Sequence, residues 1–223
     1  MPQKKQRIDE LMEKVGAAMA RTAYFEAERL AVKALQMARQ DADFDAMARI
    51  ILPLQEARRL RTQLAIDAGN VRVIEEPITD EMHIEPGCYL IQPPLVGADA
   101  RKLRLAALQR EVPVAIVCRE PKTKLGLWPI VAVGAGDTVR TRVKPPAKPA
   151  APAMSWFVSA MEAIGDEAIA SIDPAMESVR RLDAAIAKLD IIPEHEKLHQ
   201  FIEKLCREAA SAEPTGKRPR VKS

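Results

Sequence analysis

Four alanines at helical spacing mark the stretch from Ala23 to Leu64 more strongly than any other feature of the chain. They are Ala27, Ala31, Ala34 and Ala38. Steps of four, three and four residues place them on one face of an α-helix. Because this face carries no bulky side chains, a neighbouring helix can approach its backbone closely. The stretch therefore predicts stacked helices in the first third of the protein.

Further helices are expected on both sides of this alanine helix. The first covers about residues 4–20, because its apolar side chains recur at helical spacing. The third begins after Asp43, which is the expected N-cap. Pro53 removes the hydrogen bond to the carbonyl of Arg49, which predicts a kink or a break of this third helix near Leu52.

The alanine helix resembles the second helix of a tetratricopeptide repeat. In that family an aromatic residue is followed three positions later by a small alanine and, one or two turns further on, by another, as Tyr24, Ala27 and Ala34 are here. Ala31 stands where the family usually has an aromatic residue, and Arg39 where it usually has proline. The resemblance covers about one and a half repeats. It implies a surface that binds partner proteins and carries out no chemistry.

The pattern changes from helix to strand after residue 70. Strands are expected at residues 71–74, 88–91, 112–118, 128–133 and 138–143. A helix beginning at Asp99 separates the second strand from the third, so these two should be parallel neighbours. The last two strands form a further pair across a glycine-containing loop.

A proline- and alanine-rich linker follows, and amphipathic helices continue beyond it. We therefore predict an α+β protein with five segments. They are a tetratricopeptide-like helical unit (1–69), a small mixed α/β domain (70–143), the linker (144–153), a C-terminal helical hairpin or bundle (154–212) and a basic disordered tail (213–223).

The composition fits a helix-rich chain with a large core, because 48% of the 223 residues are hydrophobic and only 4% are aromatic. The net charge of +3 comes from 34 basic and 31 acidic side chains, which is too even to mark the whole protein as a nucleic-acid binder. No apolar run approaches the ~20 residues that cross a bilayer. We expect a cytoplasmic protein without a membrane partner.

Three cysteines, Cys88, Cys118 and Cys206, lie far apart and show no Cys-x-x-Cys spacing. We predict that they are free thiols in a reducing compartment.

One motif is associated with chemistry. His195, Glu196 and His199 match His-Glu-x-x-His, the zinc-binding motif of the zincin metallopeptidases; the match implies two histidine ligands and a glutamate general base. However, Pro193 opens the helix two residues earlier, Lys197 places a cation between the ligands, and a third ligand is not evident. His195 also belongs to an apolar stripe. We therefore interpret it as a histidine at the edge of the core.

Two other segments are weaker candidates for anion binding. Arg58, Arg59 and Arg61 form either a phosphate-binding stripe or a solvated helix face with ion pairs to residues such as Glu56, and we favour the second interpretation. The loop at residues 92–99 joins a strand to a helix N-terminus, but it has one glycine and ends on an acidic residue.

These patterns predict a non-enzymatic protein-interaction or assembly module that binds a partner protein. We assign no catalytic, cofactor-binding or metal-binding residue. The alternatives are a zinc-dependent hydrolase that uses His195, Glu196 and His199, and weak nucleic-acid binding through Arg58, Arg59, Arg61 and the basic tail.

Overall fold

The computed structural model describes residues 2–121, 124 and 126–212. These residues form seven helices and five strands, an α+β fold as predicted. The helices are α1 (Pro2–Ala20), α2 (Tyr24–Gln40), α3 (Phe44–Asp67), α4 (Gly97–Gln109), α5 (Met154–Ala170), α6 (Ser178–Ile191) and α7 (Glu196–Ala212). The strands are β1 (Val71–Ile74), β2 (Gly87–Ile91), β3 (Val114–Arg119), β4 (Trp128–Val133) and β5 (Thr138–Val143). The predicted basic tail lies outside the described residues.

All five strands belong to one sheet in the order β1-β2-β3-β4-β5. The pairs β1–β2 and β2–β3 are parallel, whereas β3–β4 and β4–β5 are antiparallel. The β-α-β pattern correctly predicted that β2 and β3 are parallel neighbours. The predicted pairing of the last two strands is also confirmed.

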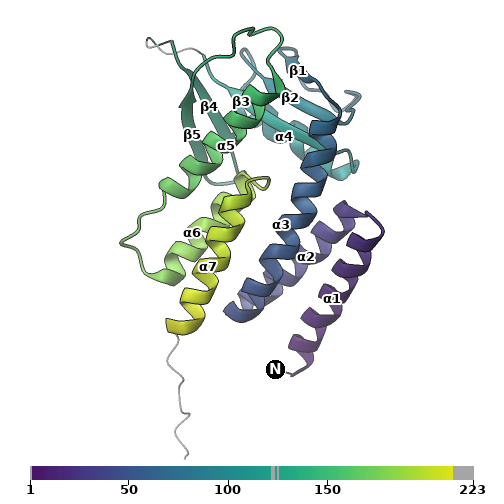
Figure 1. The fold of residues 1–223 in the computed structure, drawn as a ribbon, viewed down its shortest axis with the longest axis vertical. Coiled ribbons are helices and arrows are strands. Elements are labelled where there is room, and N and C mark those ends of the chain that lie inside the picture. The colour runs from purple at the N-terminus through teal and green to yellow at the C-terminus, as the bar shows by residue number, and fades with distance from the viewer. Residues whose placement is uncertain (1, 122–123, 125, 213–223) are drawn as a thin grey trace, which may run out of the picture.

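Helices cover both faces of this sheet (Figure 1). Leu103 of α4 shares one apolar core with Val114 and Cys118 of β3. On the opposite face, α5 and the strands form a second core, to which Phe157 of α5 and Val117 of β3 belong. The alternation of side chains along β3 supplies both cores, because successive residues of a strand point to opposite faces.

The remaining helices form a bundle below the sheet (Figure 1). Helices α1, α2 and α3 share one core with α6 and α7. The alanine face of α2 is completely buried in this core, and its members are Ala27, Ala31, Ala34 and Ala38. Small side chains therefore lie where α2 contacts α1 and α3. Helix α3 extends from the bundle to the sheet and contacts β2 and β3.

The hydrophobic cores cross the segment boundaries that the sequence suggested. Helix α5 follows the proline-rich segment but packs on the sheet, whereas α6 and α7 pack with the N-terminal helices. The proline-rich segment is itself anchored, because Trp156 of α5 donates a hydrogen bond to the carbonyl oxygen of Lys144 at 2.8 Å. Two of its prolines, Pro146 and Pro152, are buried.

Helix α3 continues through Pro53, so a break near Leu52 does not occur. A proline inside a helix costs about 3 kcal/mol, because it removes a hydrogen bond and its ring clashes with the carbonyl four residues earlier. Burial of Ile50, Ile51 and Leu54 on both sides of the proline offsets that cost, because each fully buried side chain of this size contributes about 1.5–3 kcal/mol. Among the described residues, no helix combines the length and apolarity needed to cross a membrane.

Candidate functional site

A short turn between α6 and α7, residues 192–195, brings charged side chains from four helices together. Arg104 of α4 donates hydrogen bonds to backbone carbonyls at the end of α6. Glu194 lies 3.8 Å from Arg61 of α3, and His195 faces α5. The histidine motif and the arginine cluster, which are far apart in the sequence, therefore meet at this turn.

The three residues of the His-Glu-x-x-His motif contact three different partners. His195 precedes α7 and turns toward α5. The Nδ1 atom of His199 is 2.9 Å from the carbonyl oxygen of His195, and its Nε2 atom is 3.4 Å from Arg58 Nη1. Glu196 accepts a hydrogen bond from Gln55 at 3.3 Å. Both nitrogens of His199 are thus engaged with protein atoms, and this arrangement does not form the two-histidine zinc site of the motif.

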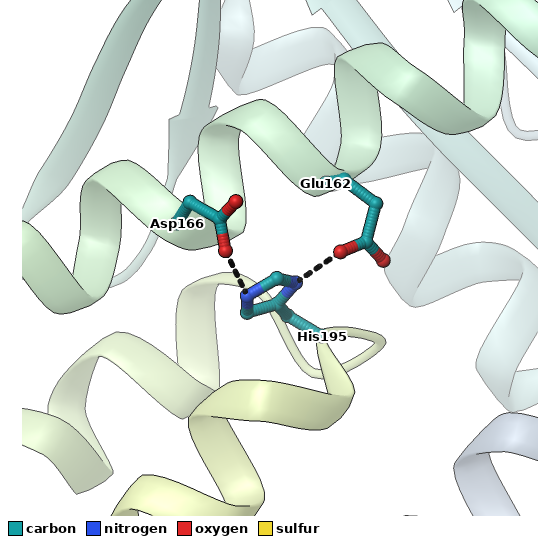
Figure 2. Close-up of side chains that lie close together, drawn as sticks. All are labelled: Glu162, Asp166 and His195. Carbon is teal, nitrogen blue, oxygen red and sulfur yellow. Dashed lines mark ion pairs between the residues drawn. The ribbon is translucent and has the colours of Figure 1, made fainter.

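His195 instead lies between two carboxylates that the sequence analysis did not connect with it. Its Nε2 atom is 3.3 Å from Asp166 and its Nδ1 atom is 3.8 Å from Glu162 (Figure 2). These acids are four residues apart on α5, so they project from the same side of that helix. The side chain of His195 is only 1% exposed, as expected for a histidine at the edge of the core. Its Nε2 atom is close enough to Asp166 for an ion pair. However, it makes no well-aligned hydrogen bond with any residue that the structure describes.

Glu162, Asp166 and His195 have ligand atoms within 4.8 Å of one another, which is close enough to consider a metal ion. Two observations argue against this use. The two carboxylates face different nitrogens of the ring (Figure 2), and Lys197 Nζ already lies 2.9 Å from Asp166 and 3.3 Å from Glu162. The lysine lowers the pKa of Asp166 through its hydrogen bond. The ammonium group of Lys197 therefore already neutralises charge on these two carboxylates.

Burial keeps both histidines neutral near physiological pH. Desolvation lowers the pKa of His195, although Glu162 and Asp166 oppose the change. Desolvation and the guanidinium of Arg58 lower the pKa of His199 to about 3. Its Nδ1 atom faces a carbonyl oxygen, which assigns the proton of the neutral ring to that nitrogen.

This burial predicts a loss of stability in mild acid. An unfolded chain protonates His199 near its usual pKa of 6.5, whereas the folded chain resists protonation down to about 3. Between these values the unfolded state binds more protons, so stability is present above 6.5 and falls as pH falls. From about pH 7 to about pH 5 the loss attributable to His199 is about 2 kcal/mol.

Urea unfolding at the two pH values measures this loss, and His199→Gln should reduce it. Replacing the exposed His83, whose side chain is 87% exposed, provides the matched control and should leave the pH dependence unchanged. An equal pH dependence in wild type and His199→Gln would contradict the assignment.

The predicted solvated arginine face is wrong for two of its three members. Arg58 and Arg61 are buried, and both contact the buried Glu28 of α2. Arg58 Nε donates to one carboxylate oxygen at 2.8 Å, and Arg61 Nη1 lies 2.7 Å from the other. Only Arg59 forms the predicted local pair, with two hydrogen bonds of 2.8 Å to Glu56. Because Arg58 and Arg61 point inward, they present no continuous cationic face to a nucleic acid.

A groove between α2, α3 and α4 borders this buried charged cluster. It has a volume of about 330 Å³, and we call it the arginine groove. Its cationic lining residues are Arg29, Arg58, Arg61 and Arg104, and its acidic lining residues are Glu28 and Asp190. Its apolar lining includes Val32, Leu105 and Leu108. The Nε atom of the buried Arg61 has no hydrogen-bond partner in the part of the chain that the structure describes.

The side chains of Gln92 and Asp99, in the loop at residues 92–99, already have hydrogen-bond partners within the protein. Gln92 is buried, and its amide contacts Glu75 and the guanidinium of Arg119. Asp99 lies in the first turn of α4 and accepts a hydrogen bond from the backbone N–H of Val96 at 2.8 Å. Its carboxylate thus occupies the position that a bound anion would take at this helix N-terminus.

The cysteines are free, as predicted, and the structure shows that all three are buried. Burial raises the pKa of Cys88 to about 11 and the pKa of Cys118 and Cys206 to about 12. These thiols remain protonated at neutral pH and are poor nucleophiles.

Sequence reasoning missed Glu28, Glu162, Asp166 and Arg104 as members of the charged site. One signal was present, because Gly165 interrupts an otherwise regular helix between the two acids. A Cβ atom at Gly165 would lie 2.1 Å from Cγ of His195. The glycine thus marks the place where the imidazole ring approaches the backbone of α5.

Comparisons with protein-family models, with curated proteins and with solved structures found no match. Inferences about function therefore rest on the geometry of this chain.

Proposed function

We propose that this protein is a non-enzymatic interaction module that binds an acidic, leucine-bearing segment of a partner protein in the arginine groove. The observation that carries this proposal is the position of two exposed leucines beside four arginines. Leu105 and Leu108 are 44% and 37% exposed and both line the groove. They are three residues apart on α4, so their side chains are neighbours on one helix face.

The chemistry of the groove indicates the chemistry of the partner. Four guanidiniums and two carboxylates line it, so the lining carries an excess of positive charge. Part of this charge is compensated within the protein, because Arg58 and Arg61 contact Glu28, and Arg29 pairs with Glu111. Among the described residues, Arg104 contacts backbone carbonyls only, which leaves it able to receive a carboxylate from a partner.

A protein segment fits this groove better than a compact small molecule. Val32 of α2 and the two leucines of α4 form an apolar wall between two helices, which is the type of surface that receives an amphipathic segment. The resemblance of α2 to a tetratricopeptide helix supports the same class of function. The buried thiols and the separated histidine motif offer no comparable support for catalysis.

Selection from a random peptide library displayed on phage tests the proposal, because peptides of every composition then compete for binding to the groove. We expect the selected peptides to combine Leu or another large apolar residue with Asp or Glu. Binding of a selected synthetic peptide should weaken about thirtyfold or more in Leu105→Ser/Leu108→Ser, because loss of even one hot-spot residue costs about 2 kcal/mol.

Leu64→Ser provides a matched control, since Leu64 is 46% exposed on α3 and does not line the groove. The proposal fails if the selected peptides lack acidic residues, or if the control substitution weakens binding as much as the double substitution.

A further inference from the structure

The sheet opens between β3 and β4. Within the described strands only two residue pairs join them, Cys118 with Val131 and Arg119 with Ile130. By contrast, five pairs join β2 to β3 and six join β4 to β5. The pairing continues just past β3, where the backbone N–H of Glu120 donates to the carbonyl oxygen of Pro129 at 2.9 Å. Toward the start of β3 and the end of β4 no residue pair joins the described strands, so the opening lies at that end.

A cavity occupies this opening. It has a volume of about 60 Å³, and we call it the sheet cavity. Its walls include Ile116 from the α4 side of the sheet and Ile130 and Ala132 from the α5 side. The cavity extends to the surface at Glu162, whose side chain is 48% exposed.

Two arginines of α4 line the cavity without a carboxylate partner of their own among the described residues. Arg101 makes no hydrogen bond or ion pair with any residue that the structure describes. Arg104 contacts only the carbonyl oxygens of Asp190 and Ile191. These arginines are three residues apart and project from the same side of α4. Burial lowers the pKa of Arg104, the carboxylate of Glu194 opposes this change, and the neighbouring guanidiniums of Arg101, Arg58 and Arg61 add to it.

The two carboxylates that also line the cavity are already engaged. Glu194 faces Arg61 at 3.8 Å, and Glu162 faces Lys197 at 3.3 Å. An added anion would therefore complete the coordination of Arg101 and Arg104.

We propose that the sheet cavity binds a short, branched apolar carboxylate. The carboxylate group binds between Arg101 and Arg104, and the hydrocarbon tail packs against Ile116, Ile130 and Ala132. The small volume of the cavity, about 60 Å³, limits the ligand to a short tail. We take the isobutyl group of isovalerate as the tail of the probe.

Three isosteric probes test this assignment at neutral pH. They are isovalerate, the neutral isovaleramide and the cationic isoamylamine, each titrated into the full chain labelled with ¹³C at isoleucine methyl groups. We expect isovalerate alone to shift the methyl signals of Ile116 and Ile130 in a saturable manner. Arg101→Gln should raise the dissociation constant for isovalerate about ten- to a hundredfold, because it removes a charge-assisted hydrogen bond.

Arg101 is the appropriate residue to change because it lines the sheet cavity and not the arginine groove, whereas Arg104 lines both. Arg101→Gln should leave the thermal midpoint of the free protein unchanged, since the side chain has no partner to lose among the described residues. Arg142→Gln, which replaces an exposed arginine on β5, is the matched control and should leave the affinity unchanged.

The proposal is overturned if isovalerate does not bind, or if isovaleramide or isoamylamine binds as tightly. It is equally overturned if inorganic phosphate competes with isovalerate at equal concentration, or if Arg101→Gln retains the wild-type affinity. Loss of peptide binding in the groove would not affect these outcomes, because that experiment changes Leu105 and Leu108.

Discussion

Glu28→Ala should lower the free energy of unfolding by about 3–5 kcal/mol, because it leaves two buried guanidiniums without their shared carboxylate. Arg58 and Arg61 are 7% and 6% exposed, so water cannot replace the lost partner. Arg61 retains Glu194 at 3.8 Å and the ring of Phe25 at 5.4 Å, whereas Arg58 retains only the neutral His199 among the described residues. Urea unfolding at pH 7 measures the difference.

Glu56→Ala is the matched control, because Glu56 also pairs with an arginine of α3 but does so at the surface. Exposed pairs of this kind contribute about 0–1 kcal/mol. A second comparison separates the charge from the packing: Glu28→Leu combined with Arg58→Met and Arg61→Met should recover most of the stability, since apolar replacements of a buried ion network are often neutral. Equal losses for Glu28→Ala and Glu56→Ala would show that the buried network is unimportant.

Local periodicity was sufficient to predict most of the secondary structure. The bounds of β1, β4 and β5 agree with the sequence prediction, because their apolar runs are delimited by glycine, proline or charged residues. The helices were also predicted, since each carries an apolar stripe. These signals lie within a few residues of one another and need no information about the rest of the chain.

Periodicity did not show which surface each apolar stripe contacts. The stripe of α5 contains Phe157, Ala160, Ile164 and Ala168 and would fit either a helix or a sheet. The proline-rich segment before α5 suggested a separate C-terminal unit, but prolines restrict the backbone without preventing it from packing. The structure places α5 on the sheet, and the later helices α6 and α7 return to the N-terminal bundle.

The candidate sites were harder to predict because their members are distant in sequence. Arg58 has a nearby acid, Glu56, which suggested a local surface pair, but its partner is Glu28 at a separation of 30 residues. The imidazole ring of His195 likewise faces acids of α5, and His199 contacts His195 at the backbone carbonyl. A motif defines the spacing of side chains along one helix, whereas their direction depends on the helices that pack around it.

Gly165→Ala should destabilise the protein by about 1–3 kcal/mol, although alanine is the better helix former. The added Cβ atom would lie 2.1 Å from Cγ and 2.2 Å from Nδ1 of the buried His195. The ring is 1% exposed and lies between α5 and the turn before α7, with the sheet cavity beside it. The substitution must therefore separate α5 from that turn or force His195 into another rotamer, and either change disrupts the contacts with Glu162 and Asp166.

Gly16→Ala tests this explanation against helix propensity. Gly16 is exposed within α1, and an added Cβ atom would meet no atom within 4 Å among the described residues. Alanine should stabilise the protein there by about 0.5–1 kcal/mol, because glycine loses more backbone entropy on folding. The two substitutions are chemically identical, so opposite signs in urea unfolding isolate the contact with His195. If both stabilise the protein, the imidazole ring does not lie against α5, and the His195 cluster is wrong.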